Sequence, residues 1–382
     1  MSKFIIQGGK KLEGEVTVSG SKNAALPIIA ATVLIKGKTV LYNVPNIQDV
    51  QTMFEIIRDI GGKVTKKNNK IIIDTSKVHT YEIPENLMRK MRSSVILAGA
   101  IIGKYNKANF SYPGGCEIGS RPIDLHLKGF EKLGINIREE YGEIICNTEK
   151  VQGAQIHLDF PSVGATENII LASCLAEGIT VLTNAAKEPE IEDLVKFLNK
   201  AGAKIKGEGT DRIEIIGVKR LAEISYNIMP DRIEAGTYLV AGAITGGNIK
   251  ITKANPRHIE PILNKLEEAN CILEIGKDYV QIKAPKRIKA VDIKTMPYPG
   301  FPTDMQSIFT AITTTAKGTS IIIENIFENR YKYVQELVRM GAKVTIEGRT
   351  AVVKGTRKLH GASVKATDLR GGAAMVKLQL MK

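Results

Sequence analysis

The fold is decided by a pattern that first occupies residues 21–62, which open with SKNAALP (21–27). A polar residue there precedes an apolar helix, a glycine turn leads into the β-rich run GKTVL (37–41), and a second helix ends at IGG (60–62). Glycines at that point suit the left-handed position that closes many helices. The segment therefore predicts a unit that mixes short strands with two helices.

The same pattern recurs with a period of roughly 70 residues, which indicates internal repetition. Later copies open at RSSV (92–95), GATEN (164–168), EAG (234–236) and DMQ (304–306), and their second helices end at LGI (133–135), AGA (201–203), Cys271 and MGA (340–342). The second copy carries an insertion, and the fourth ends on a cysteine where glycine is expected. We predict βαβαββ-type modules grouped three and three into two α/β domains, with a hinge at residues 229–231.

A sixth copy opens at ATDLRGGAA (366–374), close to the last residue, Lys382. We expect this copy to lack its glycine turn, strand and second helix, or about 30 residues by comparison with the other copies. The ending VKLQLMK (376–382) also interrupts the expected apolar run with polar residues. These features predict a truncated sixth unit.

The charge balance favours anionic ligands. Lys and Arg total 54 against 40 Asp and Glu, a formal net charge of +14, which attracts nucleic acid, anionic membranes or small phosphorylated molecules. Aromatic residues make up 5%, Trp is absent, and no segment interleaves Arg with Tyr or Phe as a base-stacking surface would. We interpret the basic cluster 63–70 as a solvated turn between strands. Small anionic ligands are therefore favoured over nucleic acid.

Neither a membrane span nor a structural zinc site is predicted. The longest apolar stretches, near 24–35 and 95–102, are too short to cross a bilayer, and the first ten residues hold no signal-peptide apolar region. The four cysteines include no CxxC pair and no histidine at ligand spacing. Reduced thiols in a cytosolic protein are the expectation.

Residues 112–122 (YPGGCEIGSRP) form the most unusual segment, a loop rich in glycine and proline. A thiol at Cys116 beside the guanidinium of Arg121 can have a lowered pKa and act as acid, base or nucleophile. The alternative is a surface loop with an incidental cysteine, and the residues alone do not separate the two. The remaining cysteines are interpreted as buried packing residues: Cys146, Cys174 and Cys271.

Polar and charged residues recur at the starts of the repeats. They are Lys22, Asn23, Arg92, Thr166, Glu167, Glu234, Asp304, Asp368 and Arg370. If the modules pack with pseudo-symmetry, these helix N-termini converge on a cleft between the domains, where free N–H groups attract anions. Arg121 and Arg330 would add guanidinium groups that clamp phosphate or carboxylate. The alternative for each residue alone is a helix cap or a surface charge.

Two further residues have competing interpretations. Asp304 follows a proline-rich turn in PGFPTDMQ (299–306), where an acid is usually an N-cap, but in a charged cleft it can accept a proton from a hydroxyl. The five histidines form no metal-binding pattern and are interpreted as structural, except His126, which follows the cysteine loop closely.

Five motifs together resemble the enolpyruvyl transferase family. They are SGSKNAALP (19–27), PGGCEIGSRPIDLHL (113–127), FPTDMQ (301–306), ENRY (328–331) and ATDLR (366–370), and they occur in order from residue 1 to the region of residue 375. The PGGC…RP loop is typical of the branch that acts on a sugar nucleotide rather than on shikimate 3-phosphate. The resemblance implies two inside-out α/β barrels of three units each, with the active site between them. It places residues 22–229 in the first domain and residues 1–21 plus 230–382 in the second.

The resemblance also implies a reaction. The enolpyruvyl group of phosphoenolpyruvate would pass to the 3′-hydroxyl of UDP-N-acetylglucosamine with release of phosphate, which commits the sugar to peptidoglycan in the cytoplasm. Cys116 would be the general acid that protonates the methylene carbon, can form a phospholactoyl adduct, and is alkylated by fosfomycin. Asp304 would assist deprotonation of the hydroxyl, and Asp368 would support the elimination. No metal, other cofactor, nucleic acid or membrane partner is implied.

Substrate contacts follow from the same resemblance. Lys22 and Arg121 would hold the phosphate of phosphoenolpyruvate, Arg370 would hold its carboxylate, and Arg330 would steady the charged cleft. The sugar nucleotide would be lined by Asn23, Arg92, Arg121, Pro122, Ile123, Asp124, Leu125, Ser162, Val163, Gly164, Asp304 and Ile326. Fixed positive charge suits this chemistry, because both substrates are anionic.

The sequence departs from the family where a further arginine, which closes onto the phosphate, would lie past Lys382. We therefore expect weak or no turnover and lowered stability. Two other hypotheses stay open at this point. One is a non-catalytic relic that binds the UDP-sugar, and the other is a nucleic-acid-binding protein, which only the charge of +14 supports.

Overall fold

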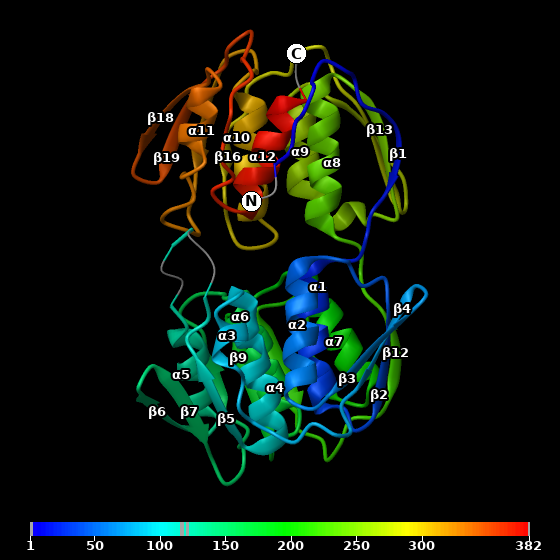
Figure 1. Cartoon of the computed structure of the whole chain (residues 1–382), viewed down its shortest axis with the longest axis vertical. Coiled ribbons are helices and arrows are strands. Elements are labelled where there is room, and N and C mark those ends of the chain that lie inside the picture. Colours follow the sequence, from blue (N-terminus) through cyan, green and yellow to red (C-terminus); the bar gives the residue numbers. More distant parts are fainter. Residues whose placement is uncertain (1–2, 115–117, 120–121, 381–382) are drawn as a thin grey trace. The chain divides into compact units, whose positions relative to one another are not determined.

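The protein is described by a computed structural model that covers residues 3–114, 118–119 and 122–380. The chain separates into two compact units, and many of their helices and strands are labelled in Figure 1. Unit 1 contains Met1–Val18, Glu117–Arg121 and Pro230–Lys382, and unit 2 contains Ser19–Cys116 and Pro122–Met229. Each unit has its own cluster of buried apolar side chains.

Unit 2 contains three successive modules that mix helices with strands. In chain order its elements are α1 (Lys22–Ala31), η1 (Thr32–Leu34), β2 (Lys38–Tyr42), α2 (Gln48–Asp59), β3 (Lys63–Lys67), β4 (Lys70–Asp74), α3 (Glu85–Met88), η2 (Arg92–Val95), α4 (Ile96–Tyr105), β5 (Lys107–Ser111), α5 (Asp124–Lys132), β6 (Asn136–Glu140), β7 (Glu143–Asn147), β8 (Gln155–His157), α6 (Val163–Ser173), β9 (Ile179–Thr183), α7 (Pro189–Lys200), β10 (Lys204–Lys206), β11 (Arg212–Ile216) and β12 (Ile224–Asn227).

Unit 1 repeats the module in the second half of the chain and adds one strand from the first residues. Its elements are β1 (Glu13–Thr17), α8 (Arg232–Thr245), β13 (Asn248–Thr252), η3 (Pro256–Ile259), α9 (Glu260–Glu268), β14 (Ile272–Ile275), β15 (Tyr279–Lys283), β16 (Ile293–Lys294), η4 (Thr303–Met305), α10 (Gln306–Thr313), β17 (Thr319–Ile323), α11 (Val334–Arg339), β18 (Lys343–Glu347), β19 (Thr350–Lys354) and α12 (Leu369–Gln379).

The sheets share one topology. Four of them have four strands, in the orders β12-β2-β4-β3, β8-β9-β11-β10, β1-β13-β15-β14 and β16-β17-β19-β18. In each, the first pair is parallel and the other pairs are antiparallel. The sheet of the second module, β5-β7-β6, has three strands. A single parallel bridge between Glu82 and Asn109 occupies the position that a fourth strand occupies in the other sheets. The α/β prediction is confirmed, with mixed sheets.

Two strands pair with partners far away in sequence. β1 pairs with β13, so that Glu13 lies beside Asn248, and β12 pairs with β2, so that Ile224 lies beside Thr39. Each pairing is parallel and completes a sheet whose other three strands are consecutive along the chain. The first sheet of unit 2 is therefore closed by the last strand of that unit.

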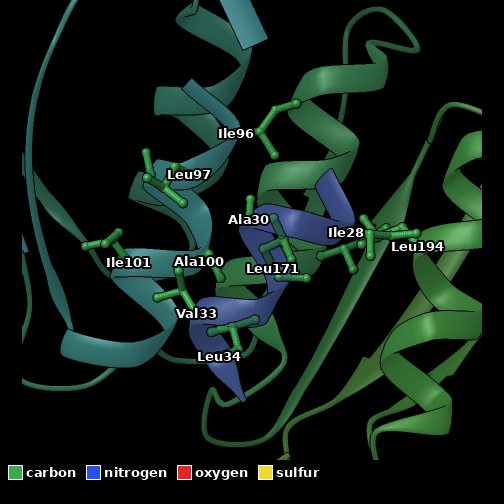
Figure 2. Close-up of a cluster of buried hydrophobic side chains, with 14 of the residues drawn as sticks. Ile28, Ala30, Val33, Leu34, Ile96, Leu97, Ala100, Ile101, Leu171 and Leu194 are labelled. Atoms are coloured by element: carbon green, nitrogen blue, oxygen red, sulfur yellow. The ribbon is translucent and has the colours of Figure 1, made fainter. Parts of the chain in front are cut away.

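Helices that open the modules form the centre of each core. In unit 2, α1 packs against α4 and α7, and α4 packs against α6. Figure 2 shows their side chains meeting, with Ile28 and Ala30 of α1, Leu97 and Ala100 of α4, and Leu171 of α6. Complete burial of such aliphatic side chains stabilises a fold by about 1.5–3 kcal/mol each for the larger ones. In unit 1, α8, α10 and α12 pack on one another in the same way.

The second helix of each module ends in the left-handed conformation, as the glycines predicted. Gly202 follows α7 with φ +105°. Gly61, Gly134 and Gly341 follow the second helices of three other modules and also have positive φ. The fourth module corrects the prediction, because its left-handed residue is Asn270, with φ +68, rather than Cys271. Asparagine is the non-glycine residue that tolerates this conformation best, so no glycine is needed there.

The basic cluster 63–70 also differs in detail from its interpretation as a turn. Residues of this cluster form β3 and the start of β4, and only positions 68–69 between them turn. The lysine side chains of β3 are exposed, as expected for a solvated hairpin at the edge of a sheet.

Candidate functional site

Asp304 is the centre of an ion-pair cluster in unit 1. It lies in η4, and its Oδ1 accepts a hydrogen bond from Arg330 Nη2 at 3.1 Å. Its Oδ2 accepts a second one from Arg370 Nη2 at 2.7 Å. The Arg330 side chain is only 3% exposed, whereas that of Asp304 is 27% exposed. The structure therefore brings together three of the predicted site residues around one accessible carboxylate.

The surroundings of Arg370 keep it charged. Burial alone would lower the pKa of this guanidinium, but the Asp304 carboxylate outweighs that effect and raises the pKa above its ordinary value. Two guanidinium groups then share one carboxylate, so the cluster keeps a net positive charge. Arg330 Nε is, within the described residues, a buried donor without an acceptor. Such an arrangement favours an anionic oxygen ligand.

The two acidic residues of this region have different roles. The Asp304 side chain caps no helix, because η4 has Pro302 at its N-cap with no side-chain hydrogen bond, so the N-cap interpretation is wrong. Asp368 does cap a helix, since its Oδ1 accepts from the N–H groups of Arg370 and Gly371, both at 3.0 Å. Asp368 therefore fixes the first turn of α12, from which Arg370 reaches Asp304.

Lys22 opens α1 in unit 2, where Ser21 caps the helix by accepting from the Ala24 N–H. Lys22 Nζ lies 2.7 Å from Asp49 Oδ2, and the two side chains are 22% and 34% exposed. Asn23 follows in the same turn and is half-buried. An accessible ion pair of this kind holds an ammonium group in place without fully neutralising it.

The predicted sugar-nucleotide residues of unit 2 lie at helix starts. Ser162 caps α6 through the Ala165 N–H at 3.3 Å, and Val163 and Gly164 form the first turn. Gly164 backs onto buried His126, because a Cβ there would lie 3.1 Å from the imidazole Cε1. His126 Nδ1 is in turn 2.7 Å from Asn168 Nδ2. His126 therefore supports the backbone at this helix start.

The remaining predicted residues differ in how deeply they are buried and in the elements to which they belong. Ile123 is buried and Leu125 packs partly against the core, while Pro122 and Asp124 are exposed, Asp124 being the first residue of α5. Arg92 opens η2 and is half-buried. Cys116 and Arg121 lie outside the described residues. The convergence of the helix starts on one cleft between the domains stays a prediction.

The other cysteines pack in the cores, as predicted. Cys146, Cys174 and Cys271 are buried free thiols, and burial raises the pKa of each to about 12. Thiols held in the neutral form are poor nucleophiles. Of the four cysteines, these three are therefore unsuited to acid–base or nucleophilic work near neutral pH.

Glu324 is a polar residue of this region that the sequence reasoning missed. Its completely buried carboxylate accepts hydrogen bonds from Thr303, the neighbour of Asp304, and from the backbone N–H of Ile326. The signal was present, because an acid directly follows the apolar strand TSIII (319–323). Asp49, the partner of Lys22, was missed too, and nothing in its local pattern distinguishes it.

No helix among the described residues is long and apolar enough to cross a membrane. No group of three or more His, Cys, Asp or Glu side chains in the described ranges is arranged to hold a metal ion.

Comparison with known proteins places the chain among curated relatives. The family model described as EPSP synthase (3-phosphoshikimate 1-carboxyvinyltransferase) matches residues 6–381. UDP-N-acetylglucosamine 1-carboxyvinyltransferase 2 of Caldanaerobacter subterraneus subsp. tengcongensis is 56% identical over 377 residues, which cover 98% of this chain and 90% of that protein. UDP-N-acetylglucosamine 1-carboxyvinyltransferase of Geobacter metallireducens is 50% identical over 376 residues, with the same coverage of 98% and 90%.

Solved structures agree on the fold. The enolpyruvyl transferase NikO from Streptomyces tendae superposes with a TM-score of 0.87 at 22% identity, covering 98% of this chain and 90% of that one. An EPSP synthase from Acinetobacter baumannii gives a TM-score of 0.73 at 19% identity, covering 98% and 91%. At such identities the likeness concerns the fold alone.

Proposed function

The chain belongs to the EPSP synthase family of enolpyruvyl transferases, and from this premise we propose that it is a UDP-N-acetylglucosamine 1-carboxyvinyltransferase. It transfers the enolpyruvyl group of phosphoenolpyruvate to the 3′-hydroxyl of UDP-N-acetylglucosamine and releases phosphate. The names of relatives that are 50–56% identical support this substrate pair over shikimate 3-phosphate. The reaction supplies peptidoglycan synthesis, and because both substrates are water-soluble anions the proposal places it in the cytoplasm.

The observation that carries the proposal is the Asp304 cluster. A half-exposed carboxylate held by Arg330 and Arg370 can accept a proton from a hydroxyl, while the surplus guanidinium charge binds an anionic reaction partner. Asp304 takes the proton of the sugar hydroxyl as the hydroxyl oxygen bonds to C2 of phosphoenolpyruvate. Arg370 binds the phosphoenolpyruvate carboxylate, and Arg330 steadies the negative charge.

Cys116 gives a proton to C3 of phosphoenolpyruvate in the same addition step, which converts its methylene group to a methyl group. The C2–O bond to phosphate then breaks, the Cys116 thiolate takes a proton back from C3, and the phosphate leaves with the proton held by Asp304, so that the enolpyruvyl ether and free phosphate result. Asp368 supports this elimination. Lys22 and Arg121 hold the departing phosphate, and fosfomycin alkylates the Cys116 thiol. The accessible ammonium group of Lys22 supports its role as a phosphate ligand.

The proposed architecture has two inside-out α/β barrels, in which the helices that open the modules form the interior. Residues 22–229 make one domain, and residues 1–21 plus 230–382 make the other. Mutual packing of α8, α10 and α12, and of α1 with α4 and of α4 with α6, supports helices at the centre of each unit. The proposed active site is lined in part by Asn23, Arg92, residues 121–125, residues 162–164 and Ile326.

A non-catalytic UDP-sugar-binding relic is the second candidate. Coverage of 90% of each of the two relatives' length argues against it. Nothing in the comparisons favours a nucleic-acid-binding protein.

Phosphate release from phosphoenolpyruvate tests the proposal. The unmodified chain, Cys116→Ala and the matched control Cys271→Ala are each assayed with and without UDP-N-acetylglucosamine. We expect release only with the UDP-sugar, retained in Cys271→Ala and lost in Cys116→Ala. Binding of the UDP-sugar without any release from the folded chain would favour the relic, and full release by Cys116→Ala would contradict the role of Cys116.

A further inference from the structure

Glu324 is a buried acid with an unusually complete set of hydrogen-bond donors. Its side chain is 0% exposed, and it directly follows β17. Thr295 Oγ1 and Thr303 Oγ1 each donate to Oε1 at 3.0 Å, and Thr303 Oγ1 also lies 3.0 Å from Oε2. The backbone N–H groups of Ile326 and Phe327 donate to Oε1 at 2.9 and 3.1 Å. An ionised carboxylate only accepts hydrogen bonds, so it suits four donors well.

Three of these donors belong to the two segments that meet at Asp304, and the fourth, Thr295, belongs to a separate stretch that follows β16. Thr303 precedes Asp304 in η4. Ile326 and Phe327 begin the loop that leads to Arg330, whose guanidinium is 3.1 Å from Asp304. Glu324 therefore ties the backbone that carries the carboxylate to the backbone that carries its arginine.

We propose that Glu324 is a positioning residue, which sets the place of the Asp304 carboxylate relative to Arg330 and Ile326 without touching a substrate. The inference rests on the proposed function, in which Asp304 accepts the proton of the sugar hydroxyl. A group that transfers a proton must stay within hydrogen-bond reach of it, and a displacement of 1 Å can lower a rate by about 10²-fold.

Two substitutions test separately the Glu324 carboxylate and the Thr303 hydroxyl that links it to the backbone of Asp304. All four donors reach Oε1, so Glu324→Gln keeps the shape and one acceptor oxygen but removes the negative charge, which weakens these charge-assisted hydrogen bonds. Thr303→Val removes the hydroxyl beside Asp304 and leaves Glu324 in place. Glu336→Gln is the matched control, because Glu336 of α11 also accepts from a backbone N–H, that of Lys365, and its carboxylate pairs with Arg339, which lies outside the Asp304 cluster.

The kinetic test measures phosphate release as kcat and as KM for UDP-N-acetylglucosamine. We expect Glu324→Gln to lower kcat by about 10²-fold and to change KM far less, with Thr303→Val acting in the same direction and Glu336→Gln keeping the kcat of the unmodified chain. In an Asp304→Asn background, Glu324→Gln should lower kcat no further, because it acts through Asp304. An equal fold-loss in both backgrounds, or an equal loss in Glu336→Gln, would overturn the proposal.

Crystal structures provide a readout that does not depend on turnover. In Glu324→Gln, we expect the Asp304 carboxylate to move away from Arg330, whereas Glu336→Gln should keep the separation of 3.1 Å. An unmoved Asp304 in Glu324→Gln overturns the positioning role. If the unmodified chain releases no phosphate, the proposed function fails, and these two structures decide the positioning role by themselves.

Discussion

Helices α8 and α12 of unit 1 begin with the same kind of cap, but one equivalent buried position is apolar in α8 and charged in α12. Asp231 caps α8 by accepting from the N–H groups of Ile233 and Glu234, and Asp368 caps α12 in the same way. The position nine residues after the cap is Val240 in α8, which is 0% exposed, but Lys377 in α12, which is 5% exposed. The repeat therefore sets which positions are buried, but it does not ensure that the residue there is apolar.

Burial of Lys377 has a free-energy cost. Its pKa is lowered from 10.5 to about 8, first by burial and then by the nearby charge of Arg370. The same position in α1 and α6, nine residues after Ser21 and Ser162, holds Ala30 and Leu171, which are completely buried. A charged ammonium group in the core of α12 thus lowers the stability of unit 1 relative to an apolar residue.

The largest effect is expected from making α8 resemble α12. Val240→Lys places an ammonium group where the native side chain is 0% exposed, without a partner carboxylate designed for it. We expect the free energy of unfolding of unit 1 to fall by about 4 kcal/mol, as for other uncompensated buried charges. Urea denaturation measures this loss, with Val240→Met as the control for side-chain size. A loss below about 1 kcal/mol would show that this position tolerates charge.

The reverse change, Lys377→Met, should stabilise unit 1. A pKa lowered from 10.5 to about 8 corresponds to about 3 kcal/mol at pH 7, where the folded chain must keep the buried group protonated. Urea denaturation at pH 7 measures the gain. The control is Lys354→Met on β19, an exposed lysine whose loss should change little. Equal shifts in the two variants would contradict the cost assigned to burial.

The pH dependence of stability should distinguish the unmodified chain from the Lys377→Met variant. Between pH 8 and 10.5 the unfolded chain keeps the Lys377 proton and the folded chain releases it, so this group makes stability rise with pH. Burial raises the pKa of Cys271 to about 12. Above the ordinary pKa of a thiol, this group therefore makes stability fall with pH. The difference between unmodified chain and Lys377→Met, measured by urea denaturation from pH 7 to 10.5, isolates the lysine. We expect that difference to shrink as pH rises, and a constant difference would contradict the shift.

The smallest effect concerns the feature that the two helices share. Asp231→Ala and Asp368→Ala each remove a cap with two backbone donors, and each should lower the free energy of unfolding by about 1 kcal/mol. Thermal unfolding checks both, with Asp→Asn variants that keep a capping oxygen as controls. Losses as large in the Asn variants as in the Ala variants would show that the caps contribute little.

Local sequence signals predicted much of the fold. The apolar runs after polar openings predicted the first helix of every module to within a few residues of its start, because a cap residue and an apolar stretch act within a single turn. The left-handed ends were predicted at Gly61, Gly134, Gly202 and Gly341, and missed only at Asn270, where a different residue type adopts the same φ. The α/β class followed from these short-range preferences.

Longer-range features could not be predicted in this way. The pairing of β12 with β2 joins residues 185 apart, as in the bond from Asn43 to Ile228, and no local pattern encodes such a partner. Asp304 was predicted at the site, but neither its place behind the N-cap residue Pro302 nor its pairing with two arginines from distant segments is encoded in the local pattern. The four donors of Glu324 likewise come from three separate stretches of chain.

The long-range parallel pairs also determine the order in which the two units can complete their sheets during synthesis on the ribosome. β1 is among the first strands to emerge, yet its partner β13 follows 235 residues later, as the contact between Thr17 and Thr252 shows. At about 5–20 residues per second, β1 then waits roughly 10–50 seconds for its partner. Unit 2 can finish first, because its closing strand β12 is made before any helix of unit 1. Translation speed across residues 18–252 therefore governs how long the nascent chain exposes an unpaired strand to its neighbours.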